Sequence, residues 1–149
     1  MIEYQEASVD GETDVEMHRW SDVAAPSIIG TTGLSGCIGI AVLNDSTARA
    51  WVLHAPNMQH GEEGLRSMLC DVRDASAQSD VLRVVLAGGK DDDPVVRAEI
   101  EKDRAVTRIV LAEILPLATV VEAWGLEDFF VEYEEEAWRE TQGCPHFNP

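Results

Sequence analysis

Apolar residues in the first half of the chain form two short runs followed by a helical stripe. Residues 38–43 are apolar and end at an Asn-Asp-Ser turn, which is typical of a buried strand. Residues 50–54 form a second run that ends before Pro56 and Asn57, so the two runs predict an antiparallel hairpin. Apolar residues then recur at spacings of three and four over residues 61–77, and this period predicts an amphipathic helix.

The second half of the chain alternates in the same way between strand and helix. Residues 81–87 predict a buried strand that stops at a pair of glycines. The acidic run 91–93 and Pro94 predict a helix start, because carboxylates accept the free N–H groups of a first turn and proline suits its first position. We expect this helix to end near Ile114, before Pro116.

The remaining segments carry weaker patterns. Residues 117–123 predict another strand. The alternation over residues 129–134 predicts a last strand running into an acidic tail, with a helix as the rival interpretation. Near the N-terminus, residues 22–26 predict a loop.

Length and composition fit one domain of mixed α and β structure. A chain of 149 residues can bury enough surface to fold without stabilisation by a metal or by disulfide bonds. No repeat or low-complexity linker divides it. We therefore expect a loose lead-in over residues 1–12, one α+β domain over residues 13–134, and an acidic tail over residues 135–149.

The net charge limits the classes of partner. The chain has 28 acidic and 11 basic residues, which gives a formal charge of −17. This excess argues against nucleic acid or an anionic membrane as the main partner, and it suits a basic protein surface. The alternative is that the acidic residues only keep the protein soluble. Nothing in the sequence sets the oligomeric state.

Targeting and cysteine patterns point to synthesis in the cytoplasm. The N-terminus has no basic region followed by an apolar run, so we expect no secretory signal peptide, and no segment is apolar over the length of a membrane span. Three widely spaced cysteines argue against a disulfide framework and favour a reducing compartment. Export by a signal-free route, as bacterial effectors use, stays open.

One glycine-rich run carries the strongest chemical pattern. The run Thr31-Thr32-Gly33-Leu34-Ser35-Gly36-Cys37 ends where the first strand of the hairpin begins. Glycines allow sharp turns and leave backbone N–H groups uncovered, so a cysteine here can be accessible and close to oxyanion donors. Because Cys37 starts one strand and His54 ends its antiparallel partner, both residues fall at the same end of the hairpin.

These residue types suit nucleophilic catalysis. Cysteine attacks as a thiolate and needs a base, for which His54 is the nearest candidate. The hydroxyl of Thr31 on one ring nitrogen of His54 would fix the tautomer and leave the other nitrogen facing sulfur. The backbone N–H of Cys37, with one from Ser35 or Gly36, would bind the oxyanion. The alternative is that Cys37 is a small buried strand residue and His54 a satisfied polar residue at a strand end.

Other residues carry weaker signals. Trp51, three residues before His54, and His60 are candidates for the mouth of a substrate site, and the alternatives are a packing role for Trp51 and an ordinary loop position for His60. Cys144 and His146 resemble half of a metal site but lack a second pair of ligands, so we expect no metal. The chain has no dinucleotide loop and no phosphate-binding lysine motif, so we expect no nucleotide cofactor.

The glycine-rich run resembles the catalytic signature of the CheD family of chemoreceptor glutamine deamidases. In that family a threonine precedes the cysteine by six residues and a histidine follows it by seventeen, as Thr31 and His54 do around Cys37. Leu34-Ser35-Gly36-Cys37 is also similar to the Leu-Ser-Gly-Cys motif of the cytotoxic necrotizing factor toxins and the Burkholderia lethal factor, whereas CheD proteins usually have Gly-Ser-Cys. The resemblance covers roughly residues 13 to 124, and Trp124-Gly125-Leu126-Glu127 stands where CheD has a Gly-Gly pair and an arginine.

The resemblance implies both a fold and a reaction. The implied fold is a CheD-like one, with β-sandwich-like mixed sheets flanked by helices. The implied reaction is hydrolysis of protein glutamine side-chain amides to glutamate without a cofactor, by a housekeeping enzyme or an effector. Cys37 would attack the carboxamide, His54 would move the proton, and Thr31 would orient His54, while Ser35 and Gly36 would contribute backbone groups. The partner would be a protein presenting a surface glutamine. The alternatives are a binding module that uses its acidic surface, or another thiol amidase or protease.

Overall fold

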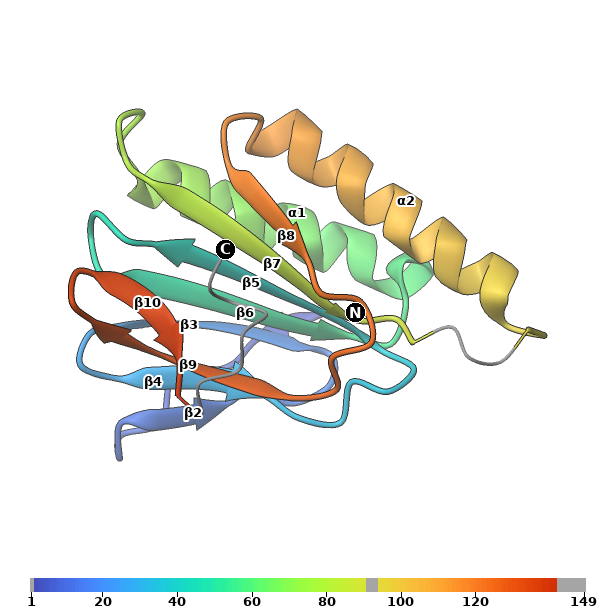
Figure 1. The fold of residues 1–149 in the computed structure, drawn as a ribbon, viewed down its shortest axis with the longest axis horizontal. Helices are drawn as coiled ribbons and strands as arrows, with labels where there is room; N and C mark the ends of the chain where they lie inside the picture. Colours follow the sequence, from blue (N-terminus) through green and yellow to red (C-terminus); the bar gives the residue numbers. More distant parts are fainter. Residues whose placement is uncertain (1, 91–93, 142–149) are drawn as a thin grey trace.

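The computed structural model describes residues 2–90 and 94–141, in which two helices cover one face of a six-stranded sheet and a four-stranded sheet covers its other face (Figure 1). The six-stranded sheet has the spatial order β1 (Glu3–Tyr4), β3 (Arg19–Ala24), β6 (Arg49–Ala55), β5 (Ile38–Asn44), β7 (Leu82–Gly88) and β8 (Thr119–Glu122). The four-stranded sheet has the order β10 (Ala137–Glu140), β9 (Phe129–Glu134), β4 (Ile28–Thr31) and β2 (Glu12–Asp14). The helices are α1 (Met58–Ala75) and α2 (Arg97–Ile114).

Both sheets mix parallel and antiparallel pairs. In the larger sheet, β3, β6, β5 and β7 pair antiparallel, while β1 and β8 add parallel edges. In the smaller sheet, β2 runs parallel to β4, and β4, β9 and β10 pair antiparallel. The described residues therefore form one α+β domain without a closed barrel, and the expected fold class is confirmed.

Two apolar cores separate the three layers, and β5 lies between them. All seven residues of β5 are buried. Ile38, Ile40 and Val42 pack against the helices, whereas Ala41 and Leu43 pack against the smaller sheet. A strand buried on both faces needs no polar positions, which explains the unbroken apolar run in the sequence.

The predicted hairpin and the two helices are present. β5 and β6 pair antiparallel, with Gly39 opposite His54. The helix α1 begins earlier than predicted because the side chain of Asn57 accepts the backbone N–H of His60 and caps the first turn. The helix α2 ends at Ile114, as predicted. The strand β8 forms within its predicted segment, and β7 is shifted by one residue from the predicted 81–87, because it includes Gly88.

The start of α2 differs from the prediction. The helix begins at Arg97, and residues 94–96 form a turn before it. The residue at the N-cap is Val96, whose side chain makes no capping hydrogen bond. The predicted acidic cap therefore does not lie at the first turn of this helix, and residues 91–93 themselves fall outside the described residues.

The N-terminal residues take part in the fold. The strand β1 pairs with β3, and β2 begins at Glu12. Ile2 is buried against Gly64 of α1, where an added Cβ would lie 2.2 Å from the Cβ of Ile2. The prediction of a loose lead-in over residues 1–12 is therefore wrong for the residues that form β1, start β2 and pack on α1.

The strand β3 replaces most of a predicted loop. Residues 22–24 belong to β3, in which Ser21 and Val23 are buried. Asp22 pairs with the guanidinium of Arg49 on the neighbouring strand β6. The pattern concealed the strand because a serine occupies its inward face and its acidic residue is held by a cross-strand partner.

The acidic C-terminal residues form a hairpin. After β9, Glu135 and Glu136 take positive φ values of 52° and 65° and turn the chain into β10, which pairs with β9. Trp138 of β10 is fully buried. The acidic tail predicted over residues 135–149 is therefore wrong as far as Thr141, and the rival helix is wrong as well. The later residues lie outside the described part of the chain.

Candidate active site

The hairpin places Cys37 and His54 on one face of the six-stranded sheet. His54 lies opposite Gly39, and Cys37 precedes Gly39 by two positions. Side chains two positions apart on a strand share a face. Cys37 accordingly packs in the core between the two sheets, whereas Ile38 packs toward the helices. Cys37 itself stands in the bend just before β5, its side chain lies on the face that holds His54, and Gly39 puts no side chain opposite His54.

Thr31 reaches His54 from the opposite sheet. The hydroxyl oxygen of Thr31 lies 2.8 Å from Nδ1 of His54 and 2.6 Å from the backbone oxygen of Val15. A carbonyl oxygen can only accept, so the hydroxyl donates to Val15 and accepts from Nδ1–H. The neutral imidazole therefore carries its proton on Nδ1 and keeps a lone pair on Nε2.

Nε2 of His54 has no partner of its own. The atom is buried and makes no hydrogen bond within residues 2–90 and 94–141, and His54 as a whole is only 3% exposed. Such atoms are rare, because a buried polar group without a partner costs about 1–3 kcal/mol. The atom lies in the layer between the two sheets that also holds Cys37, and no hydrogen bond joins it to the thiol.

Burial keeps both groups neutral. Desolvation lowers the pKa of His54 below 6.5, and this effect outweighs the nearby backbone carbonyl of Val15 and the charge of Asp14, which raise the pKa. Desolvation also raises the pKa of the Cys37 thiol above 9.0. At neutral pH the site therefore rests as a thiol beside a neutral imidazole. A thiolate at Cys37 would therefore require a base to take the thiol proton.

The end of the glycine-rich run, residues 34–37, folds as a tight turn that contains the candidate nucleophile Cys37. This segment is the nucleophile turn. The N–H of Cys37 donates to the carbonyl of Leu34 over 2.8 Å. The side chain of Leu34 is fully buried, and a Cβ on Gly39 would lie 2.6 Å from its Cδ1. Glycine at position 39 therefore makes room for Leu34, which anchors the turn, while Ser35 and Gly36 remain exposed.

This turn changes the expected set of oxyanion donors. The N–H of Cys37 is already bonded to Leu34, so the prediction that it serves as a donor does not agree with the structure. The N–H groups of Ser35 and Gly36 have no acceptor within the part of the chain that the structure describes. These two groups are the remaining candidates of the predicted set.

A glycine pair after β7 holds the backbone of Cys37. The N–H of Gly89 donates to the carbonyl of Cys37 over 2.7 Å. Gly88 has a φ of 71°, and a Cβ at this position would lie 2.1 Å from the same carbonyl oxygen. Only glycine fits there. The sequence interpretation missed this role, although a glycine pair directly after a buried strand is a signal of close backbone approach.

The segment between β8 and β9 borders the same turn. The N–H of Leu34 donates to the carbonyl of Glu127, and the N–H of Gly88 donates to the carbonyl of Leu126, both over 2.8 Å. Residues 124–127, where the sequence departs from the CheD pattern, therefore lie beside the nucleophile turn. These contacts use only backbone atoms, so the residue types in this segment could not predict them.

Of the two residues predicted for a substrate mouth, Trp51 lies away from the site and His60 lies at the surface. Trp51 is fully buried on the helix side of the sheet, and its indole N–H donates to the carboxylate of Asp71 over 2.9 Å. The prediction for Trp51 is wrong, because positions 51 and 54 of one strand point to opposite faces. His60 is exposed in the first turn of α1, and its side chain makes no hydrogen bond within the described residues.

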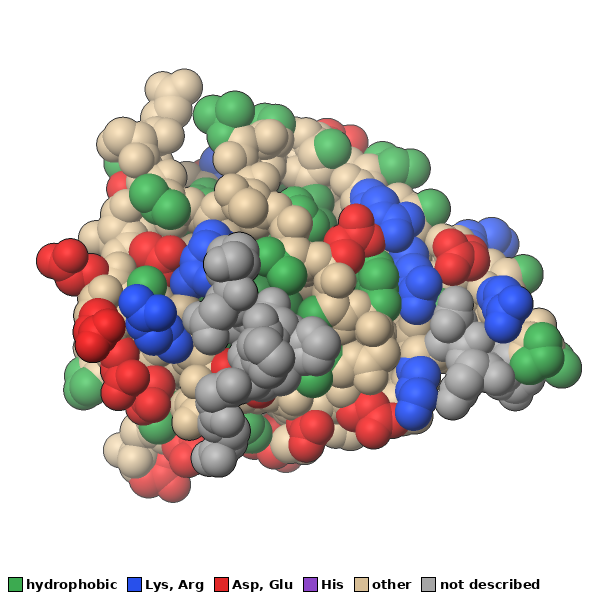
Figure 2. Space-filling model, in the orientation of Figure 1, with side chains coloured by type: hydrophobic (Ala, Val, Ile, Leu, Met, Phe, Trp, Pro, Cys, Tyr) green, Lys and Arg blue, Asp and Glu red, His purple; other side chains and the backbone are tan. Residues whose placement is uncertain are grey.

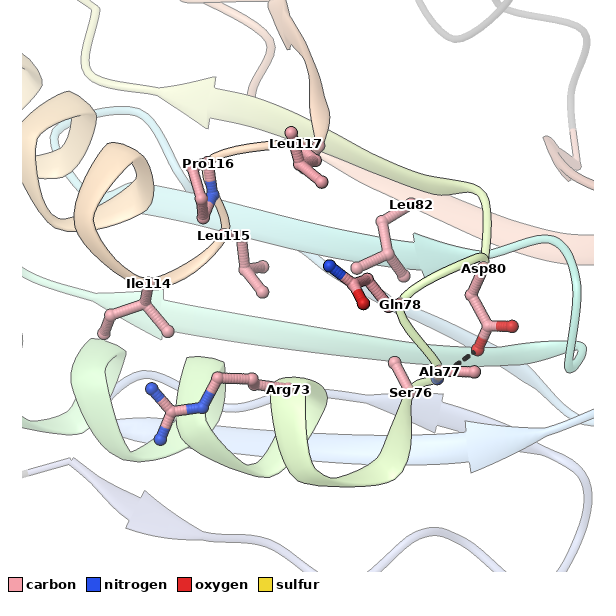
Figure 3. Close-up of a pocket in the computed structure, with 11 residues that line it drawn as sticks. Arg73, Ser76, Ala77, Gln78, Asp80, Leu82, Ile114, Leu115, Pro116 and Leu117 are labelled. Atoms are coloured by element: carbon pink, nitrogen blue, oxygen red, sulfur yellow. Dashed lines mark hydrogen bonds between the residues drawn. The ribbon is translucent and has the colours of Figure 1, made fainter.

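Figure 3 shows an apolar cavity that is separate from this site. It holds about 260 Å³ and lies between the C-terminal ends of α1 and α2. The strand β7 begins beside the cavity at Leu82 and ends at Gly88, against Cys37. The cavity therefore lies one strand length from the nucleophile. Its lining consists of Arg73, Ser76, Ala77, Gln78, Asp80, Leu82, Ile114, Leu115, Pro116, Leu117 and Ala118.

Comparisons with known proteins do not extend this picture. No protein-family model matches the sequence, and the comparison with curated proteins finds no match. Within the described residues, no three His, Cys, Asp or Glu side chains are grouped to hold a metal ion, and neither helix is long and apolar enough to cross a membrane. The half-site of Cys144 and His146 lies outside those residues.

Proposed function

We propose that this protein hydrolyses the side-chain amide of glutamine residues in a protein substrate, with Cys37 as nucleophile and His54 as general base and acid. One observation carries the proposal. Nδ1 of His54 is held by Thr31, while Nε2 is buried, unprotonated and unpaired on the face that Cys37 shares. A general base needs one ring nitrogen held and the other free, and His54 meets this requirement.

The reaction begins with the thiol. Nε2 of His54 takes the proton from Cys37 as sulfur attacks the carboxamide carbon, and the carbonyl oxygen becomes an oxyanion. The N–H groups of Ser35 and Gly36, exposed residues of the adjoining turn, would bind this charge. The imidazolium then returns its proton to the amide nitrogen, the C–N bond breaks, and ammonia leaves a thioester on Cys37.

Water completes the cycle. His54 removes a proton from a water molecule, which attacks the thioester carbon, and the C–S bond breaks with the proton returning to sulfur. The products are glutamate and ammonia, and the enzyme ends with a thiol and a neutral imidazole. Thr31 takes no part in bond changes, because it acts by holding the tautomer through its bonds to His54 and Val15.

The spacing resemblance to CheD supports glutamine as the amide, and mass spectrometry tests it directly. Candidate proteins are incubated with wild type, Cys37→Ser and His54→Gln. Deamidation predicts a gain of about one dalton at a glutamine with wild type, and no gain with Cys37→Ser. Cleaved peptide bonds would replace the proposal by a thiol protease. If no protein is modified under conditions in which Cys37 reacts with an alkylating agent, a binding role would replace it.

A second test needs no substrate. In a Cys70→Ser/Cys144→Ser background, iodoacetamide reports on Cys37 alone. Because the thiol pKa is raised, alkylation near neutral pH depends on proton transfer to His54. We expect His54→Gln to slow labelling about tenfold or more. Equal rates in both proteins would remove His54 as the base.

A further inference from the structure

The negative charge of this protein is concentrated on one layer. The four strands of the smaller sheet and the β9–β10 turn carry one basic residue, Arg139, and seven acidic residues. The acidic residues are Glu12, Asp14, Glu132, Glu134, Glu135, Glu136 and Glu140. The two helices carry eight acidic and six basic residues, so their charges nearly balance. Figure 2 shows acidic side chains along the edge formed by the smaller sheet, and basic ones mainly beside α2. General solubility would not require this asymmetry.

The outer face of the smaller sheet has no covering layer among the described elements. Along β9, Phe129 and Val131 pack inward, so Phe130, Glu132 and Glu134 point to the outer face. On β2, Thr13 is buried, which leaves Glu12 and Asp14 outward. None of the four outward carboxylates, Glu12, Asp14, Glu132 and Glu134, forms an ion pair within residues 2–90 and 94–141. Arg139 stands opposite Glu132 on β10, where its guanidinium donates to the backbone carbonyl of Glu134 and pairs with Glu135.

An aromatic ring lies among these carboxylates. Phe130 is half-buried and packs on Gly30, where a Cβ would lie 2.6 Å from its Cδ1. Asp14 is the register partner of Gly30 on the other side, so a carboxylate borders the ring. A ring face beside unpaired carboxylates suits guanidinium and ammonium groups through cation–π and ionic contacts.

This face ends at the candidate active site. Thr31 follows Gly30 and turns inward to His54, and Asp14 precedes Val15, whose carbonyl accepts the Thr31 hydroxyl. The side chain of Asp14 also accepts from the hydroxyl of Thr32, the next residue of the nucleophile run, over 3.2 Å. Independently of charge, Nε2 of His54 is buried without a partner between the two sheets, behind this end of the face.

We propose that the outer face of the smaller sheet docks an arginine- or lysine-rich segment of the protein substrate and thereby delivers a neighbouring glutamine to Cys37. The docking of a basic segment stands independently of the proposed deamidation, whereas the delivery of a glutamine to Cys37 rests on it. A second copy of the chain would meet the face with like charge, and nucleic acid or an anionic membrane would be repelled. A basic polypeptide is therefore the occupant that the face fits.

The test measures binding without turnover. The probe is a fluorescein-labelled peptide that contains one glutamine flanked by arginines, and its control replaces each arginine by neutral citrulline. With the Cys37→Ala protein, we expect the arginine peptide to bind about tenfold tighter than the citrulline peptide at about 50 mM salt, and most of this difference to disappear near 500 mM. Equal binding of both peptides at low salt would overturn the docking proposal.

Matched variants locate the binding. Glu12→Gln/Glu132→Gln/Glu134→Gln removes three charges from the sheet face, and Glu63→Gln/Asp74→Asn/Glu99→Gln removes three from the helices. Both sets lie at the surface, and thermal melting verifies that each variant folds. We expect the sheet-face variant to lose about tenfold in affinity for the arginine peptide, and the helix variant less than about twofold. Equal losses would mean that only total charge matters, and the inference would fail.

Two results separate the docking from the chemistry. If the arginine peptide binds at the sheet face but wild type never converts its glutamine or that of any basic protein, the deamidation fails and the docking surface stands. If wild type deamidates a protein and both triple variants do so with the same kcat/KM, the deamidation stands and the docking fails. Phe130→Ala adds an uncharged check, because loss of the ring should weaken the arginine peptide more than the citrulline peptide.

Discussion

The hydroxyl of Thr31 lies 2.8 Å from Nδ1 of His54, and this contact joins the four-stranded sheet to the six-stranded sheet at the candidate active site. Both residues are buried. Because the Thr31 hydroxyl is also bound to the carbonyl of Val15, its orientation is fixed, and so is the imidazole that it holds. The packing of two sheets therefore sets which nitrogen of the base is free.

Replacing Thr31 by valine should remove the hydrogen bond that fixes the Nδ1–H tautomer of His54. Thr31→Val keeps the shape but leaves Nδ1–H and the Val15 carbonyl without this partner, so we expect a loss of about 2 kcal/mol in the free energy of unfolding. We also expect kcat/KM for deamidation to fall about 10- to 100-fold. Nitrogen-15 spectra of the imidazole would show a mixture of tautomers in place of the Nδ1–H form.

Thr31→Ser is the matched control for that change. It restores the hydroxyl with one methyl group fewer, so it should recover the Nδ1–H spectrum and most of the activity at a small cost in stability. If serine and valine reduce activity equally, the hydroxyl has no positioning role and Thr31 is only a packing residue.

The buried imidazole should make stability depend on pH. The pKa of His54 is lower in the folded protein than its usual 6.5, so the unfolded chain binds the proton more readily. The contribution of His54 is therefore complete above pH 6.5 and declines as pH falls below that value toward the lowered folded pKa. Melting temperatures should decrease between about pH 6.5 and 5 in wild type, and less steeply in His54→Gln.

His60→Gln provides the comparison for the pH experiment. His60 is exposed, so its replacement should leave the slope of melting temperature against pH unchanged. If His60→Gln and His54→Gln flatten the slope equally, the acid sensitivity comes from the total number of histidines and not from the buried one.

Alanine at position 88 should disturb the nucleophile turn. A Cβ there would lie 2.1 Å from the carbonyl oxygen of Cys37 while the backbone keeps a φ of 71°. We expect Gly88→Ala to cost about 3 kcal/mol or more, and to slow alkylation of Cys37 in the folded protein. Gly11→Ala is the control, because Gly11 also has a positive φ of 92° but open space around its Cβ position. It should cost about 1–2 kcal/mol and leave Cys37 labelling unchanged, and equal effects on labelling would refute the steric argument.

The hairpin part of the site is local in sequence and was predictable. A buried run, an Asn-Asp-Ser turn and a second run define the pairing of β5 with β6, and that pairing alone brings Cys37 and His54 to one end. Thr31 is different, because it lies on β4, whose partner β9 comes about a hundred residues later. Periodicity contains no information on that pairing, so its contact with His54 was suggested only by side-chain chemistry and by the resemblance to a known family.

Two further features that the sequence did not predict have separate physical causes. Backbone hydrogen bonds position residues 124–127 beside the nucleophile turn, and such bonds leave no trace in residue type. Acidic composition concealed β10, although the side chain of Trp138 is buried there and its backbone N–H donates to the carboxylate of Asp45 over 2.9 Å. Charge in that segment reflects one exposed face and one turn, not absence of structure.

Trp51 gives a final test of the two-faced geometry of β6. Its indole N–H bonds to Asp71 on the helix side, whereas His54 on the same strand faces the other sheet. Trp51→Phe should therefore lower the free energy of unfolding by about 1–2 kcal/mol, since it removes a buried hydrogen bond and some packing. The rate of Cys37 alkylation should stay within about twofold of wild type, because no atom facing the nucleophile changes. Chemical denaturation and labelling of one sample measure both quantities. If Trp51→Phe slowed labelling as much as His54→Gln does, the indole would act on the site across the sheet, and the placement of Trp51 outside the site would be untenable.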